Sequence, residues 1–528
     1  MLMLKNMKKR LTIDPDGTMK LFWFYVLIIV YLLYGTGIVS DDYVTLVSES
    51  MNDGLFASLI SGNNLYLARP LFKFFYAIYF SLMGVNNYAL IDYLKIIQII
   101  LIFYQMTKFF SLFLDSATSM MASFLFIFFP THDSTTYFFL ATHLNLTIAL
   151  YFYAYYLVHS NKLIPAGIIS TIASFVSYGS PPVAFSLFIY CVVKRSYRKG
   201  LILLIPNIIY SFYFVVVTTM MKEDTKRLPD FFSFSSVLKQ FIMQICSFFD
   251  AMIGPSFFLK IWYSILENSL TSIILATLFL AAFALILKAR KESIPKAIVN
   301  KQLLAVLIVL VLSSLGMFAV TGYYPQIAFN LGNRVTIYGS LLAAYLIVVV
   351  PMPKYVRRGI LLILFGAIVG ISTHWKYWNL QQVQVVDQIR SNKVLSAYNA
   401  STTIYVSGNQ YSRMGPFSHI EFFSESYVVH GIFTLAGHAN LSLSTLNKRF
   451  AYENGIMNDK KHNFGLPIRN TITVYDSVAD RLLTIPAQDV NGYIKTLPVD
   501  YRHWIQFIEN EKLNKLILLL MPRFGYAL

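Results

Sequence analysis

Two adjacent carboxylates, Asp41 and Asp42, follow directly after the first long apolar stretch of the chain, residues 21–39. A carboxylate within hydrogen-bond reach of a hydroxyl can accept its proton as a general base. Two acids this close do not ionise independently, so we expect a raised pKa for one of them. The same pair could instead only keep a helix end soluble, and the pattern alone leaves both interpretations open.

Cationic side chains occur at several other boundaries between apolar and polar sequence. Arg69 opens the stretch "RPLFKFFYAIYFSLMG", Lys222 and Arg227 lie in "MMKEDTKRLPD", and Arg334 lies in "GYYPQIAFNLGNRVT". An arginine can hold a phosphate through two parallel hydrogen bonds, and a lysine can hold it as a point charge. These side chains are candidates for binding a lipid phosphate, although long basic side chains also serve as anchors at a membrane interface.

A third group of polar residues lies in "FFPTHDSTTYFFLATHLN", which contains His132, Asp133 and His143. We expect these side chains to line the same site, with structural hydrogen bonding as the alternative for each histidine. A carboxylate base beside a group that holds a lipid phosphate suggests transfer of a chemical group from a lipid-phosphate donor.

The composition indicates which kind of protein must position these residues. Of 528 residues, 56% are hydrophobic and only 13% are charged, about half the charged fraction of a typical soluble domain. Several apolar runs of roughly 17–25 residues are long enough to cross a bilayer, so the sequence predicts a polytopic membrane protein. The net charge of +17 is expected to set topology and to attract anionic lipids, and we expect no nucleic-acid partner.

No bound metal or cofactor is expected from the sequence. The two cysteines, Cys191 and Cys246, lie in apolar segments and provide neither a disulfide framework nor metal-ligand spacing. The requirement for a divalent metal is left open, because the sequence neither indicates one nor argues against it.

Lysine and arginine in short loops predict the orientation of the chain. The basic residues before the first apolar run place the N-terminus in the cytoplasm and Asp41–Asp42 on the outer face. The basic loops 194–200, 288–301 and 353–358 should also be cytoplasmic. This pattern predicts about eleven crossings, with residues 69–84 as a helix in the outer interface. The expected spans are residues 21–39, 89–108, 117–130, 137–158, 162–180, 183–193, 201–220, 268–287, 302–321, 335–351 and 359–373.

The fold class expected is therefore an α-helical polytopic membrane module over residues 1–373, followed by a small periplasmic α/β domain over residues 374–528. The last part of the chain contains a stretch with helical periodicity, residues 376–398, and two β-branched stretches that read as strands, residues 402–408 and 470–476.

The order and spacing of these features resemble the GT-C superfamily of integral-membrane glycosyltransferases. The acidic pair Asp41–Asp42 after the first span, the element Arg69-Pro70-Leu71 before a short apolar helix, and "FFPTHDS" match features of that superfamily over about residues 20–160. The remainder is similar only in having many spans and an outer C-terminal domain, as in bacterial O-antigen glucosyltransferases. Ser134 stands where the superfamily has a second acid, and Asp133 substitutes for it only in part.

The resemblance implies an inverting glycosyltransferase of a bacterial inner membrane. Such an enzyme takes a sugar from a polyprenyl-phosphate donor and transfers it on the periplasmic face to an envelope glycan, such as O-antigen of lipopolysaccharide, or to a lipid-linked acceptor. The loop acid acts as the general base. The tail lacks a WWD motif, so transfer of a single sugar is expected rather than protein N-glycosylation. A polysaccharide or lipid flippase and an envelope-glycan polymerase or ligase are the alternatives.

Overall fold

The computed structural model describes residues 15–50, 69–220, 234–289, 299–321, 326–398, 402–460 and 464–499, together with residues 512, 515, 516 and 519. The fold is mostly helical, with 71% of the described residues in helices, and it carries a small sheet region near the C-terminus. Within these ranges, six helices are long and apolar enough to cross a membrane: Asn87–Phe110, Tyr197–Val217, Phe234–Leu266, Lys301–Val320, Leu331–Val349 and Lys354–Ser391. The expectation of a polytopic, mainly helical chain with a C-terminal sheet region is thus confirmed.

The helices follow the apolar runs of the sequence, because a backbone in lipid must satisfy its hydrogen bonds internally. Prolines 70, 181 and 255 each lie in the first turn of a helix. Proline is tolerated there because N–H groups of the first turn form no hydrogen bond within the helix. The longer helices are α2 (Pro15–Leu33), α6 (Ile91–Phe110), α7 (Ser116–Ile127), α9 (Thr142–His159), α10 (Leu163–Val176), α11 (Pro181–Val193), α12 (Tyr197–Met220), α15 (Leu270–Ala289), α16 (Lys301–Thr321), α17 (Ile337–Val349) and α18 (Lys354–Ser391).

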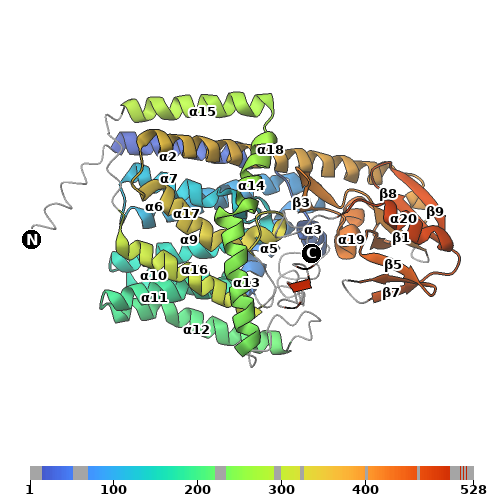
Figure 1. Ribbon diagram of the computed structural model, residues 1–528, viewed down its shortest axis with the longest axis horizontal. Helices are drawn as coiled ribbons and strands as arrows, with labels where there is room; N and C mark the ends of the chain where they lie inside the picture. Colours follow the sequence, from blue (N-terminus) through green and yellow to red (C-terminus); the bar gives the residue numbers. More distant parts are fainter. Residues whose placement is uncertain are drawn as a thin grey trace, which may run out of the picture.

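Short helices connect these elements at one end of the bundle. They are α3 (Asp41–Ser50), α5 (Pro70–Met83), η2 (Val85–Leu90), η3 (Pro130–His132), α8 (Ser134–Tyr137), η4 (Phe139–Ala141) and η5 (Leu331–Thr336). In Figure 1 the long helices run side by side, and the C-terminal sheets lie beyond one end of the bundle, next to α3. The acidic pair and the C-terminal domain therefore share one end of the molecule.

Helices α13 (Phe234–Ile253) and α14 (Pro255–Leu266) fall in a stretch for which the sequence predicts no span. In Figure 1 α13 runs crosswise to the long helices. Its buried side includes Gln240, Gln244 and Ser247, whereas Leu238 and Ile242 are exposed. The polar side of α13 therefore faces the protein and its apolar side is exposed, as expected for a helix in contact with lipid.

The described part of the C-terminal domain contains three small sheets. The main sheet has the order β4-β1-β8-β9, in which β1 pairs in parallel with β4 and β8, and β8 pairs antiparallel with β9. The hairpin β2–β3 and the antiparallel sheet β5-β6-β7 form the other two. The strands are β1 (Thr403–Ser407), β2 (Tyr411–Met414), β3 (Phe417–Glu421), β4 (Ser442–Thr445), β5 (Phe450–Glu453), β6 (Ile456–Asp459), β7 (Phe464–Pro467), β8 (Thr471–Asp476) and β9 (Arg481–Pro486), with helices α19 (Ser426–Leu435) and α20 (Val490–Thr496) and the short helices η6 (Leu395–Ala397) and η7 (Ala487–Asp489).

Strand alternation in β1 divides the domain into two cores. Ile404 and Val406 belong to the large core that continues into the helical bundle, whereas Tyr405 belongs to a separate smaller core. Successive side chains of a strand point to opposite faces, which explains this division. The domain is therefore packed directly onto the bundle through one face of its main sheet.

The hairpin β2–β3 provides a second attachment. The ring of Phe417 lies 4.6 Å from that of Phe329 and 5.8 Å from that of Tyr263 on α14, measured between centroids. Gly415 at the turn has a positive φ of 60°, and a Cβ atom there would lie 2.4 Å from the Tyr263 ring. Glycine is thus required both by the turn and by its close approach to α14.

The strands expected at residues 402–408 and 470–476 are confirmed as β1 and β8. Of the helix expected at residues 376–398, residues 376–391 belong to α18, which extends for 38 residues, is roughly 57 Å long and ends at Ser391, before η6. This helix continues without a break through residues 373 and 374, where the composition of the chain changes. The bundle and the C-terminal domain are therefore joined by a continuous helix.

Candidate active site

A buried ion pair holds the loop that leads from α2 to the acidic residues. The Asp92 carboxylate accepts hydrogen bonds from the backbone N–H groups of Gly35 (2.8 Å) and Gly37 (2.9 Å). Lys95, one turn later on α6, donates to Thr36 Oγ1 (2.7 Å) and to the Gly37 carbonyl (2.6 Å), and lies 3.2 Å from Asp92. Both glycines have a positive φ, which lets the backbone wrap around this pair.

Asp42 is fully buried, and both of its carboxylate oxygens are in use. Oδ2 accepts from the backbone N–H of Val39 (3.2 Å), and Oδ1 accepts from that of Leu140 in η4 (3.1 Å). Burial raises the pKa of Asp42 to about 7, against the opposing effects of these hydrogen bonds and of the Lys95 charge. Asp42 thus connects the start of α3 to the segment before α9.

Asp41 is partly exposed and faces a different environment. The phenol of Tyr427, from the C-terminal domain, donates to its Oδ1 at 3.1 Å. Burial raises the pKa of Asp41, whereas the Tyr427 hydrogen bond and the nearby charges of Arg334 and Arg69 lower it. The residue before it, Ser40, has φ 48°, a backbone conformation that a residue other than glycine rarely adopts. The pKa of each acid is thus raised by burial, but their surroundings differ, because Asp42 is enclosed by backbone donors whereas Asp41 is partly exposed.

Arg69 stands immediately before α5 and is almost fully buried. Its Nη1 lies 3.1 Å from His143 Nε2, and its guanidinium lies over the rings of Phe72 (5.8 Å) and Tyr178 (5.6 Å). Arginine only donates, so His143 Nε2 must accept and Nδ1 must carry the proton, which it donates to Ser177 Oγ at 2.7 Å. The guanidinium is therefore held both by stacking and by a neutral imidazole.

Arg334 lies in η5, the short helix before α17. Asn330 begins this turn with φ 56°, and its side chain accepts from the N–H of Gly332 at 2.6 Å. Arg334 is partly buried and near enough to Asp41 for its charge to lower the pKa of that carboxyl. The structure thus brings together four of the side chains predicted to form the site, which are Asp41, Arg69, His143 and Arg334.

Asp133 belongs to a separate buried network. One of its oxygens lies 3.2 Å from Lys260 Nζ on α14. The other accepts from Trp375 Nε1 on α18 (2.8 Å) and from His419 Nε2 on β3 (2.8 Å). Asn333 in η5 donates to the first oxygen as well. Burial alone would raise the pKa of Asp133, but the Lys260 charge and the donors from His419 and Trp375 outweigh it and hold the pKa below its usual range. Asp133 therefore joins four elements and has the features of a structural residue.

The protonation of His419 follows from its partners. The backbone N–H of Asn330 donates to Nδ1 at 3.1 Å, so Nδ1 carries no proton and Nε2 must donate to Asp133. Burial and the Lys260 charge, 3.0 Å away, lower the pKa of His419 to about 4. A neutral histidine of the C-terminal domain is thus enclosed within the helical bundle.

His132 is enclosed by its own local contacts. Its Nε2 donates to the carbonyl of Phe126 at 2.6 Å, and its Nδ1 lies 2.7 Å from Thr135 Oγ1. Burial lowers the pKa of His132 to about 4. Both ring nitrogens are used within residues 126–135, so the structural alternative describes His132 better than a place beside Asp41.

The other predicted cations, Lys222 and Arg227, lie outside the described residues. Within the described ranges, no group of three or more His, Cys, Asp or Glu side chains is arranged to hold a metal ion.

The residues that sequence reasoning missed come mostly from the C-terminal domain. Tyr427 contacts Asp41, and Glu425 adds its charge to the same region. Glu425 is paired through both oxygens with Arg449, at 2.9 and 3.0 Å. The local signal is the acidic and aromatic segment "ESY" at the start of α19, which by itself indicates no partner.

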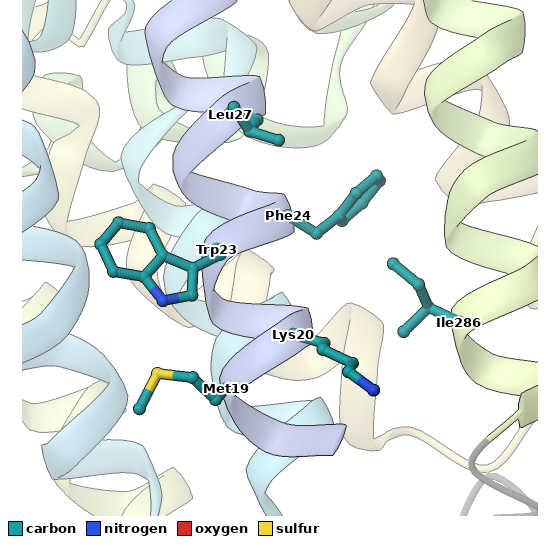
Figure 2. Close-up of a pocket in the computed structure, with 6 residues that line it drawn as sticks. All are labelled: Met19, Lys20, Trp23, Phe24, Leu27 and Ile286. Carbon is teal, nitrogen blue, oxygen red and sulfur yellow. The ribbon is translucent and has the colours of Figure 1, made fainter. Parts of the chain in front are cut away.

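A surface groove of about 460 Å³ lies elsewhere, between α2 and α15. Figure 2 shows its lining, which is apolar except for one lysine and consists of Met19, Lys20, Trp23, Phe24, Leu27 and Ile286. None of the predicted site residues contributes to it.

No protein-family model, no curated protein and no solved structure matches the chain.

Proposed function

We propose that the chain is an inverting, integral-membrane glycosyltransferase that uses a polyprenyl-phosphate sugar as donor. The observation that carries this proposal is the position of Asp41. This carboxylate is partly exposed, and it lies close enough to Arg69 and Arg334 for their charges to lower its pKa against the effect of burial. A base for a hydroxyl and two guanidinium groups for a phosphate are the two functions that such a transfer needs. The similarity of the acidic pair and the RPL element to GT-C enzymes agrees with this assignment.

The reaction assigns one task to each group. Asp41 accepts the proton of the acceptor hydroxyl while the hydroxyl oxygen attacks the anomeric carbon of the donor sugar. The bond between that carbon and the phosphate oxygen breaks, and polyprenyl phosphate leaves with the electron pair. Arg69 and Arg334 stabilise the negative charge that grows on the leaving phosphate. Asp42 holds the start of α3 through its two backbone hydrogen bonds.

We further propose about eleven crossings of a bacterial inner membrane, with the acidic pair and the C-terminal domain on the periplasmic face. Contacts between helix ends support an alternating course. Asp92, at the start of α6, binds the loop that follows α2. Ser177, after α10, meets His143 at the start of α9. Trp375 of α18 meets Asp133, which follows α7. The crosswise helix α13 then needs no crossing of its own.

The test uses the full chain in liposomes with synthetic polyprenyl-phosphate hexoses, offered one at a time, and membranes of the source cells as acceptor. Release of polyprenyl phosphate with transfer of the hexose is the expected result, and Asp41→Asn should reduce it at least 10²-fold. A flippase would move the donor between leaflets without cleaving it. Movement without release, equal in the wild type and in Asp41→Asn, would overturn the proposal in favour of transport.

A further inference from the structure

Among the described residues, one side chain of the C-terminal domain donates a hydrogen bond to Asp41. Tyr427, the second residue of α19, donates its phenolic hydrogen to Asp41 Oδ1 at 3.1 Å, although 386 positions separate the two residues. Ser40 Oγ lies 3.5 Å from the same oxygen. Among the described residues no hydrogen bond to Oδ2 is formed, so the second oxygen remains available to a hydroxyl.

The close packing of α3 and α19 makes this contact possible. A Cβ atom on Gly431 would lie 3.0 Å from the Cα of Val44, so glycine allows the two helices to approach closely. Tyr427 is four residues before Gly431, and Asp41 is three residues before Val44. Residues three or four apart lie on the same face of a helix, so both pairs lie along one line of contact between the two helices.

A buried pair of ions holds the beginning of α19. Glu425, two residues before Tyr427, is buried and receives both terminal nitrogens of Arg449, at 2.9 and 3.0 Å. Arg449 also lies 3.0 Å from Asp459 at the end of β6. A bidentate arginine–carboxylate pair fixes direction as well as distance. The backbone that carries Tyr427 is therefore attached to the interior of the C-terminal domain.

We propose that Tyr427 is a positioning residue for the base Asp41, so that the C-terminal domain completes the active site of the helical module. This inference rests on the proposed glycosyltransferase function. The phenol occupies one carboxylate oxygen and fixes the rotation of the carboxyl group, which directs the other oxygen to the acceptor hydroxyl. The hydrogen bond also favours the ionised form of Asp41, which is the form that can accept a proton.

The first experiment compares Tyr427→Phe with the wild type in liposomes that contain a polyprenyl-phosphate hexose and acceptor membranes. The variant should lower kcat about tenfold, the loss expected for one hydrogen bond to a charged group, and should leave the KM for the donor unchanged. The acidic limb of the pH–rate profile should move to higher pH, because the carboxylate loses a donor that stabilises it. Tyr493→Phe is the matched control, since it removes a hydroxyl that contacts Ser407 within the same domain. Wild-type kcat and an unmoved acidic limb in Tyr427→Phe would overturn the inference.

A second pair of variants tests the packing of the two helices without touching a polar group. Gly431→Ala pushes α19 away from α3 and should reproduce the kinetic changes of Tyr427→Phe in a folded protein. Gly492→Ala in α20 adds the same methyl group where no atom lies within 4 Å, and should change nothing. Wild-type kinetics in Gly431→Ala would contradict the inference.

Asp41→Asn distinguishes a failure of the role of Tyr427 from a failure of the proposed function. If Asp41→Asn is inactive while Tyr427→Phe and Gly431→Ala behave as wild type, only the role of Tyr427 is lost. If Asp41→Asn transfers sugar at the wild-type rate, the proposed function itself fails.

Discussion

Arg69 Nη1 lies 3.1 Å from His143 Nε2, and this contact joins the residue before α5 to the first turn of α9. The neutral imidazole of His143 accepts a hydrogen bond from the guanidinium, and the positive charge of Arg69 is not neutralised by this contact. The stacking of Arg69 between Phe72 and Tyr178 limits its rotation further. The direction of the side chain is thus fixed in advance, which lowers the entropic cost of binding the phosphate of the proposed donor.

His143→Ala should therefore weaken the binding of the donor. Loss of the acceptor frees the Arg69 side chain, so the KM for a polyprenyl-phosphate hexose should rise about tenfold, with a smaller effect on kcat. Asn145→Ala is the matched control, because Asn145 is also fully buried on α9 but bonds to Thr135. An equal change of KM in both variants would show a general effect of disturbing α9 and would argue against a specific role for His143.

Arg334→Ala should reduce kcat/KM for the donor about tenfold or more, because a charge-assisted contact with phosphate is lost, at about 1.5–3 kcal/mol. Arg334→Lys should restore only part of this loss, since an ammonium group cannot form the two parallel hydrogen bonds of a guanidinium. Steady-state kinetics at matched expression levels measure both. Full activity of Arg334→Ala would reduce this residue to a membrane anchor.

Acidification should weaken the attachment of the C-terminal domain to the bundle, because protonation of His419 disturbs its contact with Asp133. The pKa of His419 is about 4 in the folded protein, compared with an ordinary value of 6.5. Between these two pKa values the unfolded chain binds a proton at this histidine that the folded chain does not bind. The free energy of unfolding therefore decreases as the pH falls through this window, by at most about 1.4 kcal/mol per pH unit. Asp133, whose pKa is lowered, loses its contribution only at a more acidic pH.

His419→Gln isolates this effect. Glutamine can donate to Asp133 and accept from Asn330 but does not titrate, so the midpoint of thermal unfolding should fall less between pH 7 and pH 5 than in the wild type. Tryptophan fluorescence follows the opening of this region when Trp375, whose ring lies 6.0 Å from that of His419, is compared with a Trp375→Phe background. Identical pH dependence in the two proteins would show that His419 does not contribute.

The orientation of the chain can be tested with single cysteines in a background in which Cys191 and Cys246 are replaced by serine. A cysteine at Lys495, exposed on α20, should react with an impermeant maleimide added to the periplasmic side. A cysteine at Ser196, in the basic loop between α11 and α12, should react only after the membrane is permeabilised. Labelling of both positions from the same side would contradict the proposed course of the chain.

Those parts of the fold and the site that have a local signal could be predicted from the sequence. Apolar runs mark the long helices, and charges beside them mark Asp41, Arg69 and Arg334. Helix α13 was not predicted as a span, although its stretch is apolar on average and its apolar residues alternate at helical spacing with Gln240, Gln244 and Ser247.

Long-range contacts were not predictable for a different reason. The Tyr427–Asp41 and His419–Asp133 contacts join residues 386 and 286 positions apart. Nothing in the neighbourhood of either residue specifies its partner. The placement of Asp133 in a structural network, rather than beside Asp41, depends on such contacts with α14, α18 and β3, and only the folded chain brings those elements together.

The most direct test of the account compares Asp41→Asn with Asp42→Asn in a single assay of hexose transfer from a polyprenyl-phosphate donor. Asparagine preserves size and polarity but cannot accept the proton, so Asp41→Asn should lose about 10²–10⁴-fold in rate while folding and inserting normally. Asp42→Asn should lose less activity and more stability, because the amide can accept only one of the two backbone hydrogen bonds that the carboxylate receives. Transfer at the wild-type rate by Asp41→Asn would contradict the account, because no base would then be required at this position.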